Sequence, residues 1–147
     1  YGDTRDLPTA YRRKRKMCIR DSDCIEFMEE NYLKLLEING LSKMNVKHGD
    51  FLDLSYENAY DKIIANPPFS KNQDIDHVNH MYKCTAPGGR IVTIMSQSWL
   101  NGNQKKQVAF REWLQSLGAT IEKIDQGEFK ESGTNVATTL VIINKPL

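Results

Sequence analysis

The stretch YDKIIANPPF, residues 60–69, decides the fold. It contains the continuous apolar run Ile63, Ile64 and Ala65, which predicts a β-strand covered on both faces. The two prolines that follow have no backbone N–H to donate, so the strand must end where they begin. A short buried strand that ends at a rigid polar corner is typical of an open α/β sheet.

The segments around this stretch alternate between strand and helix patterns. β-branched or apolar runs predict further strands at residues 24–27, 44–48, 90–95, 119–124 and 137–144. Apolar residues at helical spacing predict helices at residues 31–38, 74–84 and 104–117. Asn39 and Gly40 are expected to end the first helix. The alternation predicts an α/β fold with a mostly parallel sheet and an antiparallel last strand.

Composition restricts the class of protein. The chain has 147 residues, 39% of them hydrophobic and 27% charged, which is enough for one domain with a real core. No apolar run approaches the roughly 20 residues that a membrane span needs, so we do not expect this chain to cross a membrane. The three cysteines Cys18, Cys24 and Cys84 form no CxxC pair. We therefore expect a reduced cytoplasmic location and no structural metal site.

Residues 1–22 differ in kind from the rest of the chain. They have seven Lys or Arg against three Asp, a net charge of +4, whereas the remaining 125 residues carry a net charge of −3. Such a segment is a solvated tail, a nucleic-acid-binding arm or non-native sequence. Because residues 17–22 resemble a translated sequencing-adapter remnant, we interpret the segment as a non-native or disordered basic head.

The motif Asn66-Pro67-Pro68-Phe69 suits a planar amino group as substrate. It follows a strand, where open α/β sheets bind their ligands. The prolines fix the backbone so that the Asn66 amide oxygen and the Pro67 carbonyl can accept both hydrogens of an NH2 group. The nitrogen lone pair then turns toward an electrophile, while Phe69 stacks on a flat substrate. The alternative is a proline-stiffened loop that buries its phenylalanine.

The motif resembles the (Asp/Asn)-Pro-Pro-(Tyr/Phe) signature of S-adenosylmethionine-dependent methyltransferases that modify planar amino nitrogens. Residues 73–78, 87–90, 110–114 and 129–134 look like segments of the phage and bacterial restriction-modification type of adenine-N6 DNA methyltransferase. The likeness covers about residues 23–146. It implies a Rossmann-like class I methyltransferase fold, with residues 23–147 as a partial methyltransferase domain. It also implies S-adenosylmethionine as cofactor and nucleic acid, DNA favoured, as partner.

The resemblance also implies roles for single residues. Asn66, Pro67, Pro68 and Phe69 match the catalytic loop, and Asn66 also lies against the cofactor. Glu26 matches the acid that binds the cofactor ribose hydroxyls, Asp50 matches the acid that accepts from the cofactor adenine, and Phe51 packs nearby. Considered singly, Glu26 is equally a surface charge at a strand end and Asp50 an ordinary turn aspartate.

One part of the family pattern is missing. The family has a glycine-rich loop after its first strand, but this sequence has no glycine between Gly2 and Gly40. We therefore expect an N-terminally truncated domain without its first strand and glycine loop. Because that loop approaches the methionine part of the cofactor, we expect the chain alone to bind S-adenosylmethionine poorly.

The expected activity is methyl transfer to an exocyclic amino nitrogen, adenine N6 in DNA before other targets. A base in a duplex has to be flipped out of the stack to reach such a site. The alternatives are methylation of protein glutamine N5 or of rRNA guanine N2. A third alternative is an inactive fragment that needs a partner chain or a separate specificity domain.

Overall fold

The computed structural model describes residues 22–42, 44–124 and 137–147. The chain divides into two compact units, one ending at Leu54 and the other running from Ser55 to Leu147, and each is described by itself. Residues 1–21 of the basic head and the segment 129–134 lie outside the described residues.

The first unit contains a parallel pair of strands joined by a helix. β1 (Asp23–Glu26), α2 (Glu29–Ser42) and β2 (Asn45–His48) follow one another, and a short 3-10 helix, η2 (Phe51–Asp53), comes after β2. All three regular elements agree with the sequence prediction in type and approximate position. The predicted end of the helix at Gly40 is wrong, because α2 continues to Ser42. A glycine inside a helix costs about 1 kcal/mol but does not by itself end it.

The second unit contains a four-stranded sheet. β3 (Tyr60–Ala65), β4 (Thr85–Ser96), β5 (Thr120–Ile124) and β6 (Thr138–Asn144) lie in the order β3-β4-β6-β5. β3 and β4 are parallel, and β6 is antiparallel to both β4 and β5. Together with the parallel pair of the first unit, this arrangement confirms the predicted α/β class with an antiparallel last strand.

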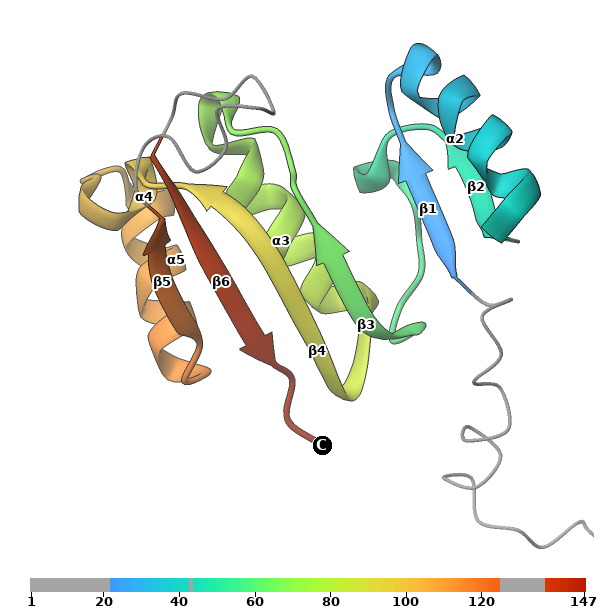
Figure 1. The fold of residues 1–147 in the computed structure, drawn as a ribbon. Coiled ribbons are helices and arrows are strands. Elements are labelled where there is room, and N and C mark those ends of the chain that lie inside the picture. The colour runs from blue at the N-terminus through green and yellow to red at the C-terminus, as the bar shows by residue number, and fades with distance from the viewer. Residues whose placement is uncertain (1–21, 43, 125–136) are drawn as a thin grey trace, which may run out of the picture. The chain divides into compact units, whose positions relative to one another are not determined.

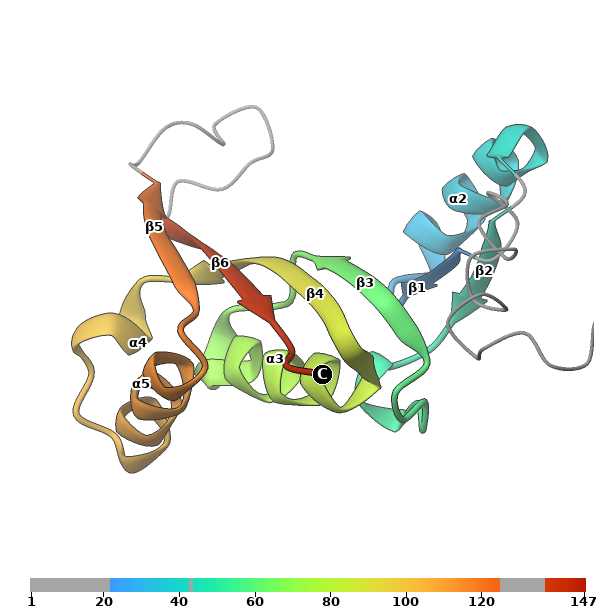
Figure 2. The ribbon, with the colours of Figure 1, turned by 90° about the horizontal axis from the view of Figure 1, so that it is seen from below.

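Three helices cover one face of this sheet, as Figures 1 and 2 show: α3 (Gln73–Cys84), α4 (Ser98–Asn101) and α5 (Lys105–Ser116). The core lies between these helices and the sheet. Its buried apolar side chains include Ile75, Val78, Met81, Ile91, Met95, Trp99, Phe110, Leu114, Val141 and Ile143. Helices α3 and α5 were predicted to within one residue at each end, because each has a clear apolar face.

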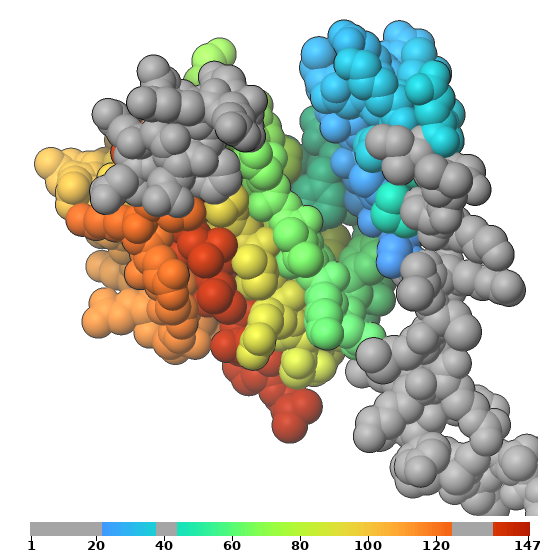
Figure 3. Space-filling view, viewed as in Figure 1, coloured from blue at the N-terminus to red at the C-terminus, as the bar shows by residue number. Residues whose placement is uncertain are grey.

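The opposite face of the sheet has an apolar centre that the described helices of this unit leave uncovered, with charged residues such as Lys62, Arg90 and Glu122 around it. Strands β5, β6, β4 and β3 are visible side by side on this face in Figure 3. None of the described helices of this unit covers it, and Ile64 of β3 is 86% exposed. Among the described residues of this unit, β3 is therefore covered on one face only, not on both as predicted. Four further apolar side chains on this face are half-buried: Val92, Ile94, Leu140 and Ile142.

Candidate functional site

The loop Asn66–Phe69 follows β3 at the carboxyl end of that strand. Ala65, the last residue of β3, pairs with Thr93 of β4. Pro67 is buried, Phe69 is half-buried, and Asn66 is exposed. The Asn66 side chain makes no hydrogen bond with any residue that the structure describes, so its amide oxygen is available to a ligand. The loop thus holds one proline inside the fold and presents the asparagine to solvent.

The backbone is unusual directly after this loop. A 3-10 turn, η3 (Ser70–Asn72), connects the loop to α3. Lys71 and Asn72 both adopt the left-handed conformation, with φ of 53° and 59°. Residues other than glycine rarely adopt this conformation, and two in succession require neighbouring groups to hold them. Asn72 is also the residue that precedes the first turn of α3.

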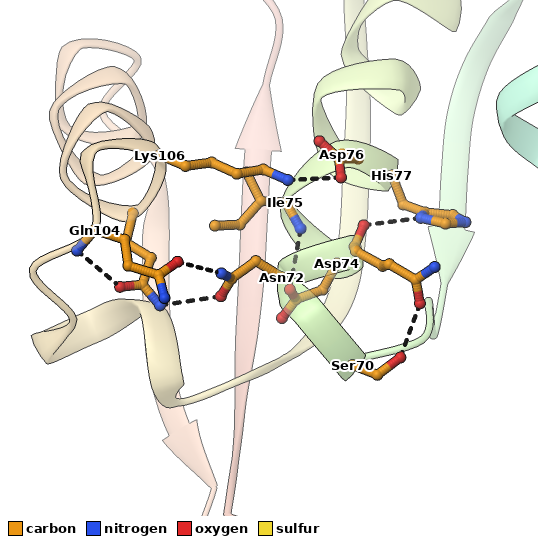
Figure 4. A network of polar contacts seen from close by, with 10 residues as sticks. Ser70, Asn72, Asp74, Ile75, Asp76, His77, Gln104 and Lys106 are labelled. Carbon is orange, nitrogen blue, oxygen red and sulfur yellow. Dashed lines mark hydrogen bonds and ion pairs between the residues drawn. The ribbon is translucent and has the colours of Figure 1, made fainter.

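The Asn72 side chain connects this turn to the start of α5 (Figure 4). Its Nδ2 donates to Gln104 Oε1 at 2.8 Å, and its Oδ1 accepts from Gln107 Nε2 at 3.0 Å. Gln107 Oε1 in turn accepts from the backbone N–H of Gln104 at 3.3 Å. Gln104 and Gln107 also form the capping box of α5, so one group of amides both begins this helix and holds the turn.

Asp74 connects the first turn of α3 to the end of β4. Its carboxylate is fully buried and accepts from the Ser96 backbone N–H at 3.1 Å and from the Ser96 hydroxyl at 2.8 Å. The Ser96 hydroxyl also contacts the Ser98 hydroxyl at 2.8 Å. Sequence reasoning missed Asn72 and the contact between Asp74 and Ser96. The Gln-x-x-Gln spacing at 104 and 107 was one signal available, since it has the spacing of a capping box, with Gln at the position where Ser or Thr is usual.

Three of the four residues assigned to the cofactor, Glu26, Asp50 and Phe51, lie in the first unit, whereas Asn66 lies in the second. Glu26 ends β1, and its Oε1 accepts from the Met28 N–H at 2.8 Å. Asp50 follows β2 and caps η2, because its Oδ1 accepts from the Leu52 N–H at 2.9 Å. Phe51 is half-buried and begins η2. The backbone N–H of Gly49 donates to the Glu26 carbonyl at 3.1 Å, which holds the two strand ends side by side.

These acids have the chemistry that an adenosine requires. In each carboxylate the structure shows a hydrogen bond to one oxygen only, and the second oxygen has no partner within the described ranges. Ribose hydroxyls and an adenine amino group are donors, and carboxylate oxygens are acceptors. Glu26 and Asp50 therefore fit the adenosine part of S-adenosylmethionine. The Asn66–Phe69 loop belongs to the second unit.

The described residues contain no group of three or more His, Cys, Asp or Glu side chains that could hold a metal ion. His77 Nδ1 lies 2.8 Å from the Gln73 carbonyl oxygen and so contacts its own helix. None of the described helices is both long and apolar enough to span a membrane.

No model of a protein family matches this sequence. No curated protein matches it either. Solved structures do match. The M protein of the type I restriction enzyme EcoKI has a TM-score of 0.68 at 18% identity, over 82% of this chain and 30% of that chain. The type I restriction-modification methyltransferase subunit of Streptococcus thermophilus has a TM-score of 0.66 at 18% identity, over 82% of this chain and 33% of that chain.

A class I S-adenosylmethionine-dependent methyltransferase from Listeria monocytogenes, itself described as putative, has a TM-score of 0.65 at 13% identity, over 86% of this chain and 45% of that chain. The fold is that of the class I methyltransferases. This confirms the predicted fold class. The chain spans less than half the length of each of these three proteins.

Proposed function

We propose that this chain is part of an S-adenosylmethionine-dependent methyltransferase that acts on an exocyclic amino nitrogen, with adenine N6 in DNA as the favoured target. The observation that carries the proposal is the Asn66–Phe69 loop at the carboxyl end of β3, which presents an exposed asparagine whose amide makes no hydrogen bond with the described part of the chain. The fold shared with two type I restriction-modification methyltransferases supports DNA over the other amino-group substrates.

The loop would act by orienting the amino group. The Asn66 amide oxygen and the Pro67 carbonyl accept its two hydrogens, which turns the nitrogen lone pair out of conjugation. No proton has to be removed from the amino group before it attacks the methyl group, because the nitrogen loses a proton only after it has gained the methyl group. Catalysis therefore rests on position and on exclusion of water rather than on a general base.

The cofactor would be held by the first unit. Glu26 accepts from the ribose hydroxyls and Asp50 from the adenine amino group, each through the carboxylate oxygen that no described residue contacts. When bound, S-adenosylmethionine supplies an electrophilic methyl group. Phe51 is placed directly after Asp50 and packs near the adenine.

A nucleobase has to leave the stack to reach Asn66. Extrusion of a base costs a few kcal/mol, and stacking on an aromatic side chain returns about 1–3 kcal/mol. Phe69 is half-buried, so part of its ring is available for such a contact. This supports a flat aromatic substrate over the amide of a protein glutamine.

The test is transfer of tritiated methyl groups from S-adenosylmethionine to a DNA duplex rich in adenine. An rRNA fragment and a peptide with glutamine serve as competing acceptors. Asn66→Ala should abolish transfer, whereas Asn79→Ala should leave it within about two-fold, because Asn79 is an exposed asparagine on α3 outside the loop. Equal activity of the two variants would contradict the role of Asn66. Transfer to rRNA or peptide alone would overturn the DNA assignment.

A second candidate has an observation of its own in its favour. Within the parts of the chain that the structure describes, β3 pairs with β4 alone, and the open sheet face includes the 86% exposed Ile64. An edge strand next to an apolar face is a template for another strand. In this case the chain alone transfers no methyl group, and a second polypeptide restores binding of S-adenosylmethionine. Binding at micromolar concentration by this chain alone would overturn this candidate.

A further inference from the structure

We propose that Asn72 is a positioning residue for the Asn66–Phe69 loop. Together with Gln104 and Gln107 it forms what we call the Asn72 clamp, a set of side-chain amides that joins the turn after the loop to the first turn of α5 (Figure 4). The catalytic consequence rests on the proposed function, but the mechanical role of the clamp does not.

The backbone around Asn72 needs a restraint. Lys71 and Asn72 are consecutive left-handed residues, and neither is a glycine. Asparagine adopts this conformation more readily than other non-glycine residues, but lysine does not, so the consecutive pair costs energy and persists where its surroundings determine it. Lys71 is exposed and has no side-chain partner among the described residues, so it cannot supply the restraint. The Asn72 amide uses both its donor and its acceptor and is the group that can.

The partner of Asn72 is itself held in place. Gln107 is only 5% exposed, and its amide makes hydrogen bonds through both ends. A side chain at Gly102 would overlap the Gln107 amide, so the glycine leaves the space that this amide fills. Arg111 also donates to the Gly102 carbonyl at 2.7 Å, which fixes the segment before α5. Asn72 is therefore bound to a rigid part of the core.

The clamp closes a short span of chain. On one side, Ala65 is fixed in the sheet through its pairing with Thr93. On the other side, Asn72 is fixed to α5 and Asp74 to the end of β4. Only residues 66–71 lie between these points, and two of them are prolines with restricted backbones. The position of the Asn66 amide relative to the sheet is thus set by fixed points on both sides, as orientation of a reacting group requires.

Asn72→Gly tests the clamp without a backbone penalty, because glycine accepts the left-handed conformation. The chain offers a matched control in Asn58, another left-handed asparagine, with φ of 52°, whose Oδ1 accepts from Lys145 Nζ at 3.0 Å. Asn58→Gly removes a side-chain hydrogen bond at the same kind of backbone site, in the turn before β3. Both variants are compared with the parent chain by amide hydrogen exchange and by thermal unfolding.

We expect Asn72→Gly to speed amide exchange of residues 69–73 by about 10-fold or more, with exchange in the β4 and β6 core unchanged. Asn58→Gly should leave exchange in residues 69–73 as in the parent chain. Asn72→Asp should give an exchange rate between those of the other two variants. A carboxylate still accepts a hydrogen bond from Gln107, but it has no donor for the Gln104 oxygen and is repelled by it. Unchanged exchange in Asn72→Gly would overturn the proposal. So would an equal rise throughout the second unit, since that is what a purely structural role predicts.

Methyl transfer then separates this proposal from the proposed function. In an active chain, Asn72→Gly should lower kcat by about 10-fold and change KM for the DNA by less than about two-fold, since the loop still binds but orients poorly. A rise in KM with kcat unchanged would overturn the positioning role. If the parent chain methylates nothing, the proposed function fails for this chain, and the exchange experiment still decides whether the clamp holds the loop.

Discussion

The two units of the molecule differ sharply in packing. In the described part of the second unit, twelve hydrophobic side chains are buried, all of them between Ile75 and Ile143. In the described part of the first unit, no side chain reaches that degree of burial, and Phe27, Met28 and Leu33 are each more than half exposed. The Asn66–Phe69 loop is therefore attached to a well-packed core, whereas the acids assigned to the cofactor are attached to a small and weakly packed unit.

This difference has a physical origin. A two-stranded sheet with one helix encloses little apolar surface, and such small units are marginally stable by themselves. The four-stranded sheet encloses a core against α3 and α5, including the Trp99–Phe110 ring pair with centroids 5.2 Å apart. The residues of the first unit that are assigned to the cofactor can therefore move at little cost, while the Asn66–Phe69 loop is held in place.

The sharpest test of this contrast is a pair of leucine substitutions on helices. Leu114 of α5 is 0% exposed, and Leu33 of α2 is 53% exposed. Leu114→Ala should lower the free energy of unfolding by about 2–5 kcal/mol, because it leaves a cavity in the core. Leu33→Ala should change it by less than about 0.5 kcal/mol, since the residue is on the surface and alanine favours a helix. Urea denaturation followed by circular dichroism measures both.

The same contrast explains which elements could be predicted from sequence. Helices α3 and α5 have one apolar face against the core, so their periodicity shows plainly in the sequence. The antiparallel return of β5 and β6 was likewise visible from two apolar runs separated by a polar loop. The exposure of Ile64 could not be predicted, because an apolar run reports what a strand can bury and not what covers it.

The candidate site shows the same limit. The Asn66–Phe69 motif was recognisable because it is local: four adjacent residues after a strand. The contacts that hold it are not local, since Asn72 meets Gln107 across 35 positions and Asp74 meets Ser96 across 22. A single sequence gives no sign of such pairs. Their roles, and those of Glu26 and Asp50, remain predictions until the substitutions are made.

Two carboxylates that bind backbone N–H groups give the next comparison. Asp74 is fully buried and accepts two hydrogen bonds from Ser96, whereas Asp50 is half-buried and accepts one from Leu52. Asp74→Ala should cost about 2–3 kcal/mol, because it leaves the buried Ser96 N–H without an acceptor. Asp50→Ala should cost about 0.5–1 kcal/mol, the usual value for a lost helix cap. Equal losses in urea denaturation would show that the two units are packed alike.

The smallest effect concerns the two described thiols and needs no substitution. Burial raises the pKa of Cys84, and burial followed by the nearby Glu26 charge raises the pKa of Cys24. A raised pKa leaves less thiolate at a given pH, so at pH 8 both should react with iodoacetamide more slowly than a free thiol, whose pKa is about 8.5. Their rates should go on rising at pH values where a free thiol has levelled off. Because the pKa of each thiol is higher in the folded chain than in the unfolded chain, folding favours the protonated thiol. The small contribution to the free energy of unfolding is complete below the pKa of the unfolded thiol and is lost as pH rises through the pKa of the folded one.

The units should separate the two thiols in the same experiment. Cys84 is 1% exposed and ends α3, so it reacts only when the second unit opens. Cys24 is half-buried in β1 and should react a few-fold faster. Its rate should rise with pH in proportion to its thiolate fraction. In urea, where both units are unfolded, Cys24 and Cys84 should be alkylated at equal rates. Mass spectrometry of the peptides that contain them measures these rates. If Cys84 reacted as fast as Cys24 in the folded chain, the second unit would open as readily as the first, and the packing contrast would be wrong.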